Sequence, residues 1–170
     1  ADKDYQLAAG ISQDVEADDS ILELTKARLP WLVLALLGGF ISVKMLGLFE
    51  GAMLEHGELF FFTPLIAAMA GNVGVQSSAI IVQGLANHSI SGSIFNRLLK
   101  EISLSLLNGA ILAAILFLGS YFLLGVEPKI GMIVTIALVS VIIIASLIGT
   151  FIPLLLDKLG IDPALATGPF

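Results

Sequence analysis

Residues 63–78 read TPLIAAMAGNVGVQSS and lie within an apolar run that is long enough to cross a lipid bilayer. Polar and helix-breaking residues stand inside this run, namely Pro64, Gly71, Asn72, Gly74 and Gln76. Such residues are costly at membrane depth unless they face other helices or a water-filled path. The stretch therefore predicts a membrane helix that borders a pore or substrate pathway rather than a lipid-facing wall.

The composition is that of a membrane protein with a polar head. The 170 residues are 57% hydrophobic, with a mean hydropathy of +1.00, which is far above the average for soluble domains. Residues 1–28 carry seven of the 14 acidic side chains and three of the eight basic ones. We therefore expect a short acidic head before an integral membrane body, with no basic patch for nucleic acid. The chain has no cysteine for disulfide or thiol chemistry.

Four apolar spans follow the head, and each is close to the roughly 20 residues that cross about 30 Å of hydrocarbon. They cover about residues 30–49, 59–86, 102–124 and 130–156. Asp162 then predicts the N-cap of a further helix with Pro163 as its first residue, and we expect the chain to stop within that helix. The predicted fold class is an all-α integral membrane protein, a polytopic bundle of four full transmembrane helices plus the start of a fifth.

Two signals in the head predict helices. Ser20-Ile21-Leu22-Glu23 has the spacing of a capping box, so a helix is expected to start there and to run into the membrane. Residues 2–10 are expected to form an earlier helix that stops at Gly10. Lysine and arginine gather in the loops on one side of the spans, at Lys26, Arg28, Arg97, Lys100 and Lys158. The positive-inside rule therefore places the N-terminus in the cytoplasm.

The second span carries a polar face. Asn72, Gln76 and Gln83 are spaced so that they share one side of a helix, and Gly71 and Gly74 leave the backbone beside Asn72 accessible. Pro64 is expected to free the carbonyl of Phe60, and Pro153 that of Gly149. Freed carbonyls are neutral oxygen ligands that suit Mg²⁺ or Ca²⁺. The alternative interpretation is that these polar residues form hydrogen bonds between helices and take no part in transport.

Other polar and small residues have simpler explanations. Lys44 either snorkels to the interface or pairs with Glu50. Asp157 and Asp162 flank the last break, where a carboxylate attracts divalent cations at a pore mouth or simply caps a helix. Small residues recur every four positions and favour close helix packing; they are Ala70, Gly74, Ser78, Ser105, Gly109, Ala113, Ala145 and Gly149. Because no catalytic constellation is visible, we do not expect an enzyme.

Two motifs resemble a known family. Pro64-Leu65-Ile66 followed by Gly71-Asn72-Val73-Gly74-Val75-Gln76-Ser77 is similar to the second membrane helix of the MgtE family of magnesium channels. Asp162-Pro163-Ala164-Leu165-Ala166 with Gly168-Pro169-Phe170 resembles the start of its fifth helix. Arg28-Leu29-Pro30-Trp31-Leu32 and the order of the spans agree, so the resemblance covers essentially the whole chain.

The resemblance implies a homodimer in the cell membrane, with a pore lined by the second and fifth helices. Residues 1–28 would be a cytoplasmic connector that resembles the family's plug helix, and residues 29–170 the pore domain. The implied metal-binding positions are Gly71, Asn72 and Gly168 on the ion path, Asp162 at its mouth, and Asp2 and Asp4 on the connector. Three features depart from the family's pattern. The family's pore carboxylate would fall beyond Phe170, and its sensor domains are not part of this sequence. Gln83 stands where many members of the family carry a basic residue.

We therefore expect a membrane domain that passes hydrated Mg²⁺ down its electrochemical gradient, with Mg²⁺ also as a regulatory ion and Mn²⁺ or Co²⁺ as alternative cargo. Two other functions are compatible with the residues. One is a cation-coupled secondary transporter, such as a Na⁺/Mg²⁺ exchanger, and the other is a scaffold subunit that transports nothing.

Overall fold

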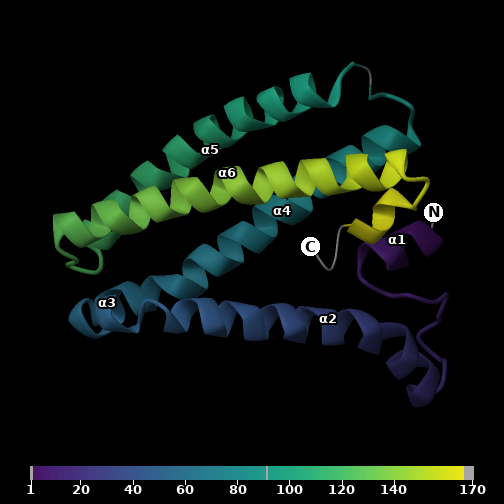
Figure 1. Ribbon diagram of the computed structural model, residues 1–170, viewed down its shortest axis with the longest axis horizontal. Coiled ribbons are helices and arrows are strands. Elements are labelled where there is room, and N and C mark those ends of the chain that lie inside the picture. Colours follow the sequence, from purple (N-terminus) through teal and green to yellow (C-terminus); the bar gives the residue numbers. More distant parts are fainter. Residues whose placement is uncertain (1, 91, 167–170) are drawn as a thin grey trace.

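A computed structural model of the chain describes residues 2–90 and 92–166, with side chains from Tyr5 onward. This part of the chain contains helices and no strand. In order they are α1 (Asp2–Ala8), α2 (Ile21–Gly47), α3 (Glu50–Glu55), the 3₁₀ helix η1 (Gly57–Phe62), α4 (Thr63–Ala86), α5 (Ile94–Phe122), α6 (Pro128–Lys158) and the 3₁₀ helix η2 (Pro163–Ala166), as Figure 1 shows.

Four of these segments are long and apolar enough to cross a membrane, which confirms the predicted fold class. They are α2 with 27 residues, η1 and α4 together with 30, α5 with 29 and α6 with 31. The third span begins at Ile94, well before the predicted start near residue 102. Ser93 explains the difference, because its Oγ accepts a hydrogen bond from the amide of Asn96 at 3.3 Å and so caps the helix.

The helix starts predicted in the head are confirmed. The Ser20 Oγ accepts from the Glu23 amide at 3.4 Å, and a Glu23 carboxylate oxygen accepts from the Ser20 amide at 3.1 Å, which completes the capping box. Helix α1 ends before Gly10, which has a φ of +79°. Helix α2 continues through residues 28 and 29 without a break, so no helix end marks the predicted boundary between connector and pore domain.

Helix α6 is the centre of a three-helix bundle, since α4 and α5 both pack along it. Small residues make these contacts close. A Cβ built on Gly149 of α6 would lie 2.5 Å from the Gly74 carbonyl oxygen of α4. On the other side, a Cβ on Gly109 of α5 would lie 3.5 Å from a methyl group of Val139. The predicted small-residue packing is therefore present at these positions.

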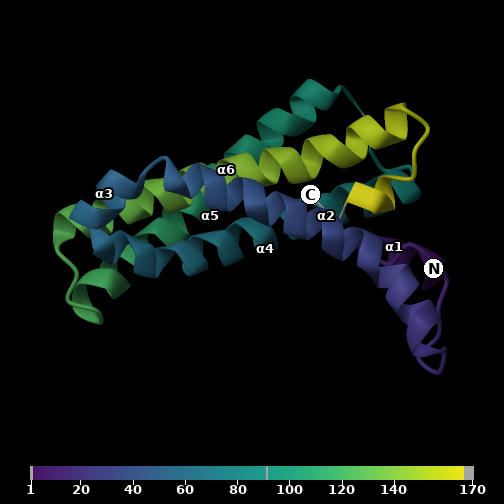
Figure 2. The same cartoon turned by 60° about the horizontal axis from the view of Figure 1, so that its bottom comes forward.

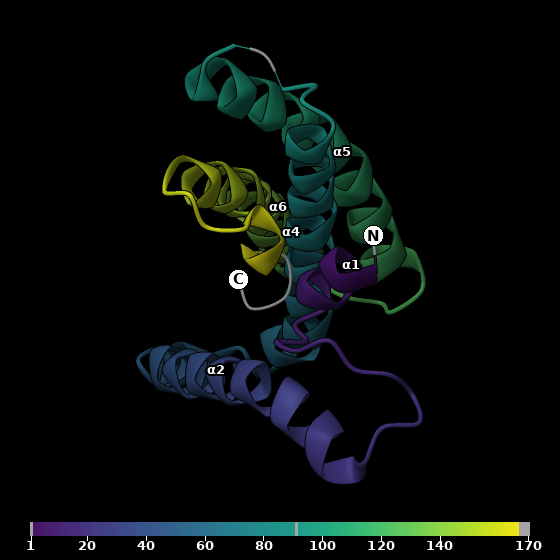
Figure 3. The same cartoon turned by 90° about the vertical axis from the view of Figure 1, so that its right-hand side faces the viewer.

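Helix α2 lies apart from this bundle. It makes few contacts with α4, α5 or α6, and its most apolar stretch contains no buried residue. Figure 3 shows α2 separated from the other long helices, and Figure 2 shows its first turns projecting away from the bundle beside α1. The leucine-rich surface of α2 is therefore open to lipid or to another protein chain.

The N-terminal segment folds back onto the start of α2 and toward η2. The backbone amide and the Oγ of Ser12 both donate to the carbonyl of Ala27, at 2.9 and 3.0 Å. Gly10 lies against Trp31, and α1 packs beside η2 (Figure 1). The two ends of the described chain are therefore neighbours at one end of the bundle.

Candidate functional site

Helix α4 presents an uncovered row of residues on the side opposite its packed face. The row is spaced at three or four residues, and all its members are exposed, namely Leu65, Ala68, Asn72, Gln76, Ala79 and Gln83. The opposite side contains the buried residues Ser77, Ser78 and Ile81. The amides of Asn72 and Gln76 form no side-chain hydrogen bond within the described part of the chain. They therefore point away from this chain's own bundle.

The two glycines beside Asn72 have different surroundings. A Cβ at Gly71 would meet no atom within 4 Å, so the backbone there is open. A Cβ at Gly74 would lie 3.8 Å from the Ala145 carbonyl oxygen of α6. Gly74 therefore belongs to the packed side of α4, whereas Gly71 leaves main-chain atoms accessible on the uncovered side.

One of the two carbonyls that we expected proline to free has a donor. Pro64 stands in the first turn of α4, and the Phe60 carbonyl accepts from the Thr63 amide. The prediction for Phe60 was therefore wrong, because the preceding 3₁₀ turn supplies a donor. Pro153 lies inside α6 and is buried, so the Gly149 carbonyl loses its usual partner there.

Asp162 acts as the predicted N-cap. Its Oδ1 accepts from the Ala164 amide at 2.9 Å at the start of η2, and its side chain is exposed. Asp157 is also exposed, near the end of α6. The described side chains form no group of three or more His, Asp or Glu that could hold a metal ion together. Gly168 and the side chains of Asp2 and Asp4 lie outside the described residues, although the backbone of both aspartates is in α1.

A buried carboxylate that the sequence did not indicate lies between α4 and α5. Glu101 is 8% exposed, and its Oε1 accepts a hydrogen bond of 2.6 Å from the Ser77 Oγ. Glu101 directly precedes the predicted third span, which was expected to begin near residue 102, so the predicted span does not include it. Recognition of the Ser93 cap would have placed it two turns inside the helix.

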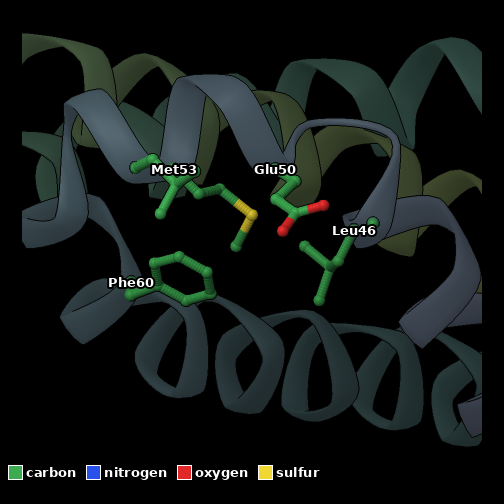
Figure 4. Close-up of a pocket in the computed structure, with 6 residues that line it drawn as sticks. Leu46, Glu50, Met53 and Phe60 are labelled. Carbon is green, nitrogen blue, oxygen red and sulfur yellow. The ribbon is translucent and has the colours of Figure 1, made fainter.

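An apolar groove of about 350 Å³ lies at the other end of the molecule, where α2 turns through α3 into η1. Its lining includes Leu46, Met53 and Phe60, and the carboxylate of Glu50 points into the same space (Figure 4). Lys44 forms no ion pair with Glu50 within the described residues. One carboxylate among apolar side chains is a poor metal site. The α4 row is therefore the better candidate for the ion path than this groove.

These features define the class of protein. Four membrane-length helices, three of them in a bundle joined by small residues, make an α-helical, multi-pass membrane protein. The family model MgtE, described as a divalent cation transporter, matches residues 63–170. The chain therefore belongs to the MgtE family, which confirms the resemblance drawn from its two motifs.

Three relatives match nearly the whole chain. The chain is 35% identical over 170 residues to "Magnesium transporter MgtE" of Bacillus subtilis (strain 168), covering 99% of this chain and 38% of that protein. It is 35% identical over 173 residues to the protein of that name from Enterococcus faecalis, covering 100% and 37%. With the Thermus thermophilus protein it shares 32% over 163 residues, covering 95% and 36%. The chain thus spans less than two-fifths of the length of each relative.

Proposed function

We propose that this chain is the pore domain of a magnesium channel or transporter, which passes hydrated Mg²⁺ across the membrane down its electrochemical gradient. The observation that carries the proposal is the uncovered row of α4. Asn72 and Gln76 are exposed in the middle of a membrane-length helix and have no partner in the described part of the chain. Amides that face hydrocarbon are costly, whereas a water-filled path satisfies them.

A second copy of the chain would supply the opposite wall of this path. The α4 row and the surface of α2 are both uncovered, and a symmetric dimer can bring identical faces together around a central axis. The small side chains of Ala68 and Ala79 on the row leave space for water between two such helices. This arrangement is the homodimer that the family motifs imply.

The chemistry of the row fits an ion that keeps its water. Mg²⁺ dehydrates reluctantly, so a path that contacts its hydration shell needs neutral oxygen acceptors more than a cage of carboxylates. The Asn72 amide and the open backbone at Gly71 provide such acceptors. At −100 mV a divalent ion gains about 4.6 kcal/mol on entry, twice the value for one charge, so inward movement needs no further energy source.

The charged residues at the two ends of the bundle are consistent with inward transport of Mg²⁺. The basic loops favour a cytoplasmic N-terminus, which places Asp157 and Asp162 at the cytoplasmic mouth. Helix α1 packs beside η2 at that end, as expected for a connector that meets the start of the fifth helix. In this proposal Gly168 belongs to the ion path, and Asp2 and Asp4 belong to the connector, where Mg²⁺ also acts as a regulatory ion. Mn²⁺ or Co²⁺ can enter by the same path.

The test is Mg²⁺ entry into proteoliposomes that contain the full-length protein and a fluorescent Mg²⁺ indicator. The vesicles are held at a set membrane potential without any other cation gradient, and protein-free vesicles are the control. Entry that follows the potential supports the proposal. A folded dimer that admits no Mg²⁺ under these conditions contradicts it.

The same vesicles separate the alternatives. Entry that appears only when a Na⁺ or proton gradient is imposed assigns the protein to coupled transport. Silence under every gradient, together with retained dimer formation, assigns it to a scaffold whose uncovered faces bind other proteins.

A further inference from the structure

The Glu101 carboxylate bridges two helices that have little other contact. Helices α4 and α5 both pack along α6 and make few direct contacts with each other, and Figure 1 shows α4 crossing behind α6. The bond from Ser77 Oγ to Glu101 Oε1, at 2.6 Å, is the one side-chain hydrogen bond between α4 and α5 in the described part of the chain. A glutamate is long enough to cross a gap that shorter side chains would leave open.

The bond lies in a buried polar layer of the bundle. Helices α5 and α6 are antiparallel, and Ser105 of α5 shares a hydrogen bond with Ser146 of α6. One turn further along each helix, this register places Glu101 across from Thr150. The Oγ1 of Thr150 is buried and has no hydrogen-bond partner among the described residues. The polar groups of three helices therefore meet at the level of Glu101.

Among the described residues, no basic side chain forms an ion pair with this carboxylate. Helix α4 contains no charged residue, and Arg97 and Lys100, the bases on α5, form no ion pair with Glu101 within the described residues. On α6 the charged residues are Lys129, Asp157 and Lys158, which lie at its two ends. A buried carboxylate is costly in a membrane protein and usually has a function, and its one described partner here is the Ser77 hydroxyl.

The position of Ser77 connects this bond to the uncovered row. Ser77 directly follows Gln76 and lies five residues after Asn72, about 7.5 Å along the helix axis. The two amides point to the opposite side of the same stiff helix. A bond that holds Ser77 from the inside therefore fixes how far α4 is rotated, and so where the row points.

We propose that Glu101 is a positioning residue for the ion path, which orients the α4 row through its hydrogen bond to Ser77. The inference rests on the proposed function for its transport readout, but the bond also has a consequence that is independent of transport. Loss of the bond lets α4 rotate about its contact with α6 and turns the row toward lipid.

The transport test compares four variants of the full-length protein in proteoliposomes. Glu101→Ala and Ser77→Ala each remove the bond, and we expect each to slow Mg²⁺ entry at least roughly fivefold. That factor corresponds to about 1 kcal/mol, the size of one hydrogen bond. Glu101→Gln keeps an oxygen that accepts from Ser77, so it should retain most of the wild-type rate. The double alanine variant should be no slower than the slower single variant, because both changes remove one bond.

Ser105→Ala is the matched control. It removes a buried hydrogen bond of the same bundle, between α5 and α6, that does not reach α4. We expect it to lower the melting temperature in detergent about as much as Ser77→Ala does, while Mg²⁺ entry stays near the wild-type rate. Equal losses of entry in the two serine variants would reduce the role of Ser77 to general stability and would overturn the proposal.

A thiol on the row gives the readout that needs no transport. This chain has no cysteine, so Ala79→Cys introduces a single reporter once any cysteines elsewhere in the full-length protein are replaced. We expect a charged methanethiosulfonate reagent to modify it more slowly in the Glu101→Ala background and at the original rate in the Glu101→Gln background.

Two further outcomes overturn the inference. Glu101→Gln that is as impaired as Glu101→Ala would show that the charge matters and not the bond. Normal entry and normal thiol reactivity in folded Ser77→Ala protein would show that the bond positions nothing. If the wild-type protein admits no Mg²⁺, the proposed function fails instead, and the thiol rates alone then decide whether Glu101 orients the row.

Discussion

Gly149 of α6 lies so close to Gly74 of α4 that a Cβ added to Gly149 would stand 2.5 Å from the Gly74 carbonyl oxygen. The carbonyl carbon and the Cα of Gly74 would also lie within 3.2 Å of that Cβ. These are main-chain atoms of a helix, which cannot move aside as the tip of a flexible side chain can. The absence of a side chain at 149 therefore sets the distance at which α4 crosses α6.

Gly149→Ala is expected to destabilise the bundle. The added methyl group must push α4 and α6 apart, and overpacking of this kind costs about 1–3 kcal/mol. The change should appear as a lower melting temperature in detergent. It should also slow Mg²⁺ entry into proteoliposomes, because α4 carries the uncovered row.

Gly71→Ala provides the control for the effect of alanine in a helix. A Cβ at Gly71 meets nothing within 4 Å, and alanine is favoured over glycine in helices by about 1 kcal/mol. We therefore expect an unchanged or higher melting temperature for Gly71→Ala. Equal destabilisation by the two substitutions would contradict the close contact between Gly74 and Gly149.

Asn72→Leu tests the uncovered row directly. The substitution removes an amide that has no partner in the described part of the chain and replaces it with an apolar side chain of similar size. We expect normal dimer assembly on size-exclusion chromatography and a Mg²⁺ entry rate reduced by roughly tenfold, equivalent to about 1.4 kcal/mol. Normal entry in the assembled variant would remove the row from the ion path.

The matched control for this change is Asn108→Leu. Asn108 is also exposed, but it lies on α5, away from the α4 row. If hydrophobic replacement of any exposed membrane asparagine reduces entry, both variants will be impaired. If the ion path runs along α4, only Asn72→Leu will show a reduced rate of Mg²⁺ entry.

Much of this fold could be predicted from the sequence because the deciding signals are local. Apolar runs of membrane length predicted the four spans, and Ser20 with Glu23 predicted the start of α2. Asp162 with Pro163 predicted the turn that follows α6. Each of these depends on residues within a few positions of one another, so no tertiary contact is needed to recognise it.

The parts that could not be predicted depend on how helices face one another. Glu101 directly precedes the predicted apolar span, and nothing nearby in the sequence indicates that it is buried. Its burial depends on the contact with Ser77 of α4, which is distant in sequence. The separation of α2 from the bundle has no local signal, since its composition resembles that of the packed helices. Pairing of Lys44 with Glu50 was one expectation, because the two residues are close in the sequence. Their side chains form no ion pair in the described structure.

Asp162 combines a structural task with a proposed electrostatic one, and two substitutions separate them. Asp162→Asn keeps an oxygen that can accept from the Ala164 amide, as aspartate does at 2.9 Å. It should therefore preserve the melting temperature and slow Mg²⁺ entry mainly at low ionic strength, where the mouth charge is least screened. Asp162→Ala should also cost about 1 kcal/mol through loss of the cap. Identical salt dependence in wild-type protein and Asp162→Asn would show that the charge does not attract ions.

Ser20→Ala is expected to loosen the first turn of α2 without affecting the bundle. The Ser20 side chain and the Glu23 carboxylate satisfy each other's backbone amides, and loss of such a cap costs about 1 kcal/mol. Hydrogen exchange, followed by mass spectrometry, should become faster in the first turn of α2 and stay unchanged in α6. Ser42→Ala is the control, because Ser42 lies inside the same helix and its hydroxyl donates to the Gly38 carbonyl of that helix. Faster exchange that spreads to α4 or α6 would mean that the start of α2 is coupled to the bundle, against the separation seen in Figure 3.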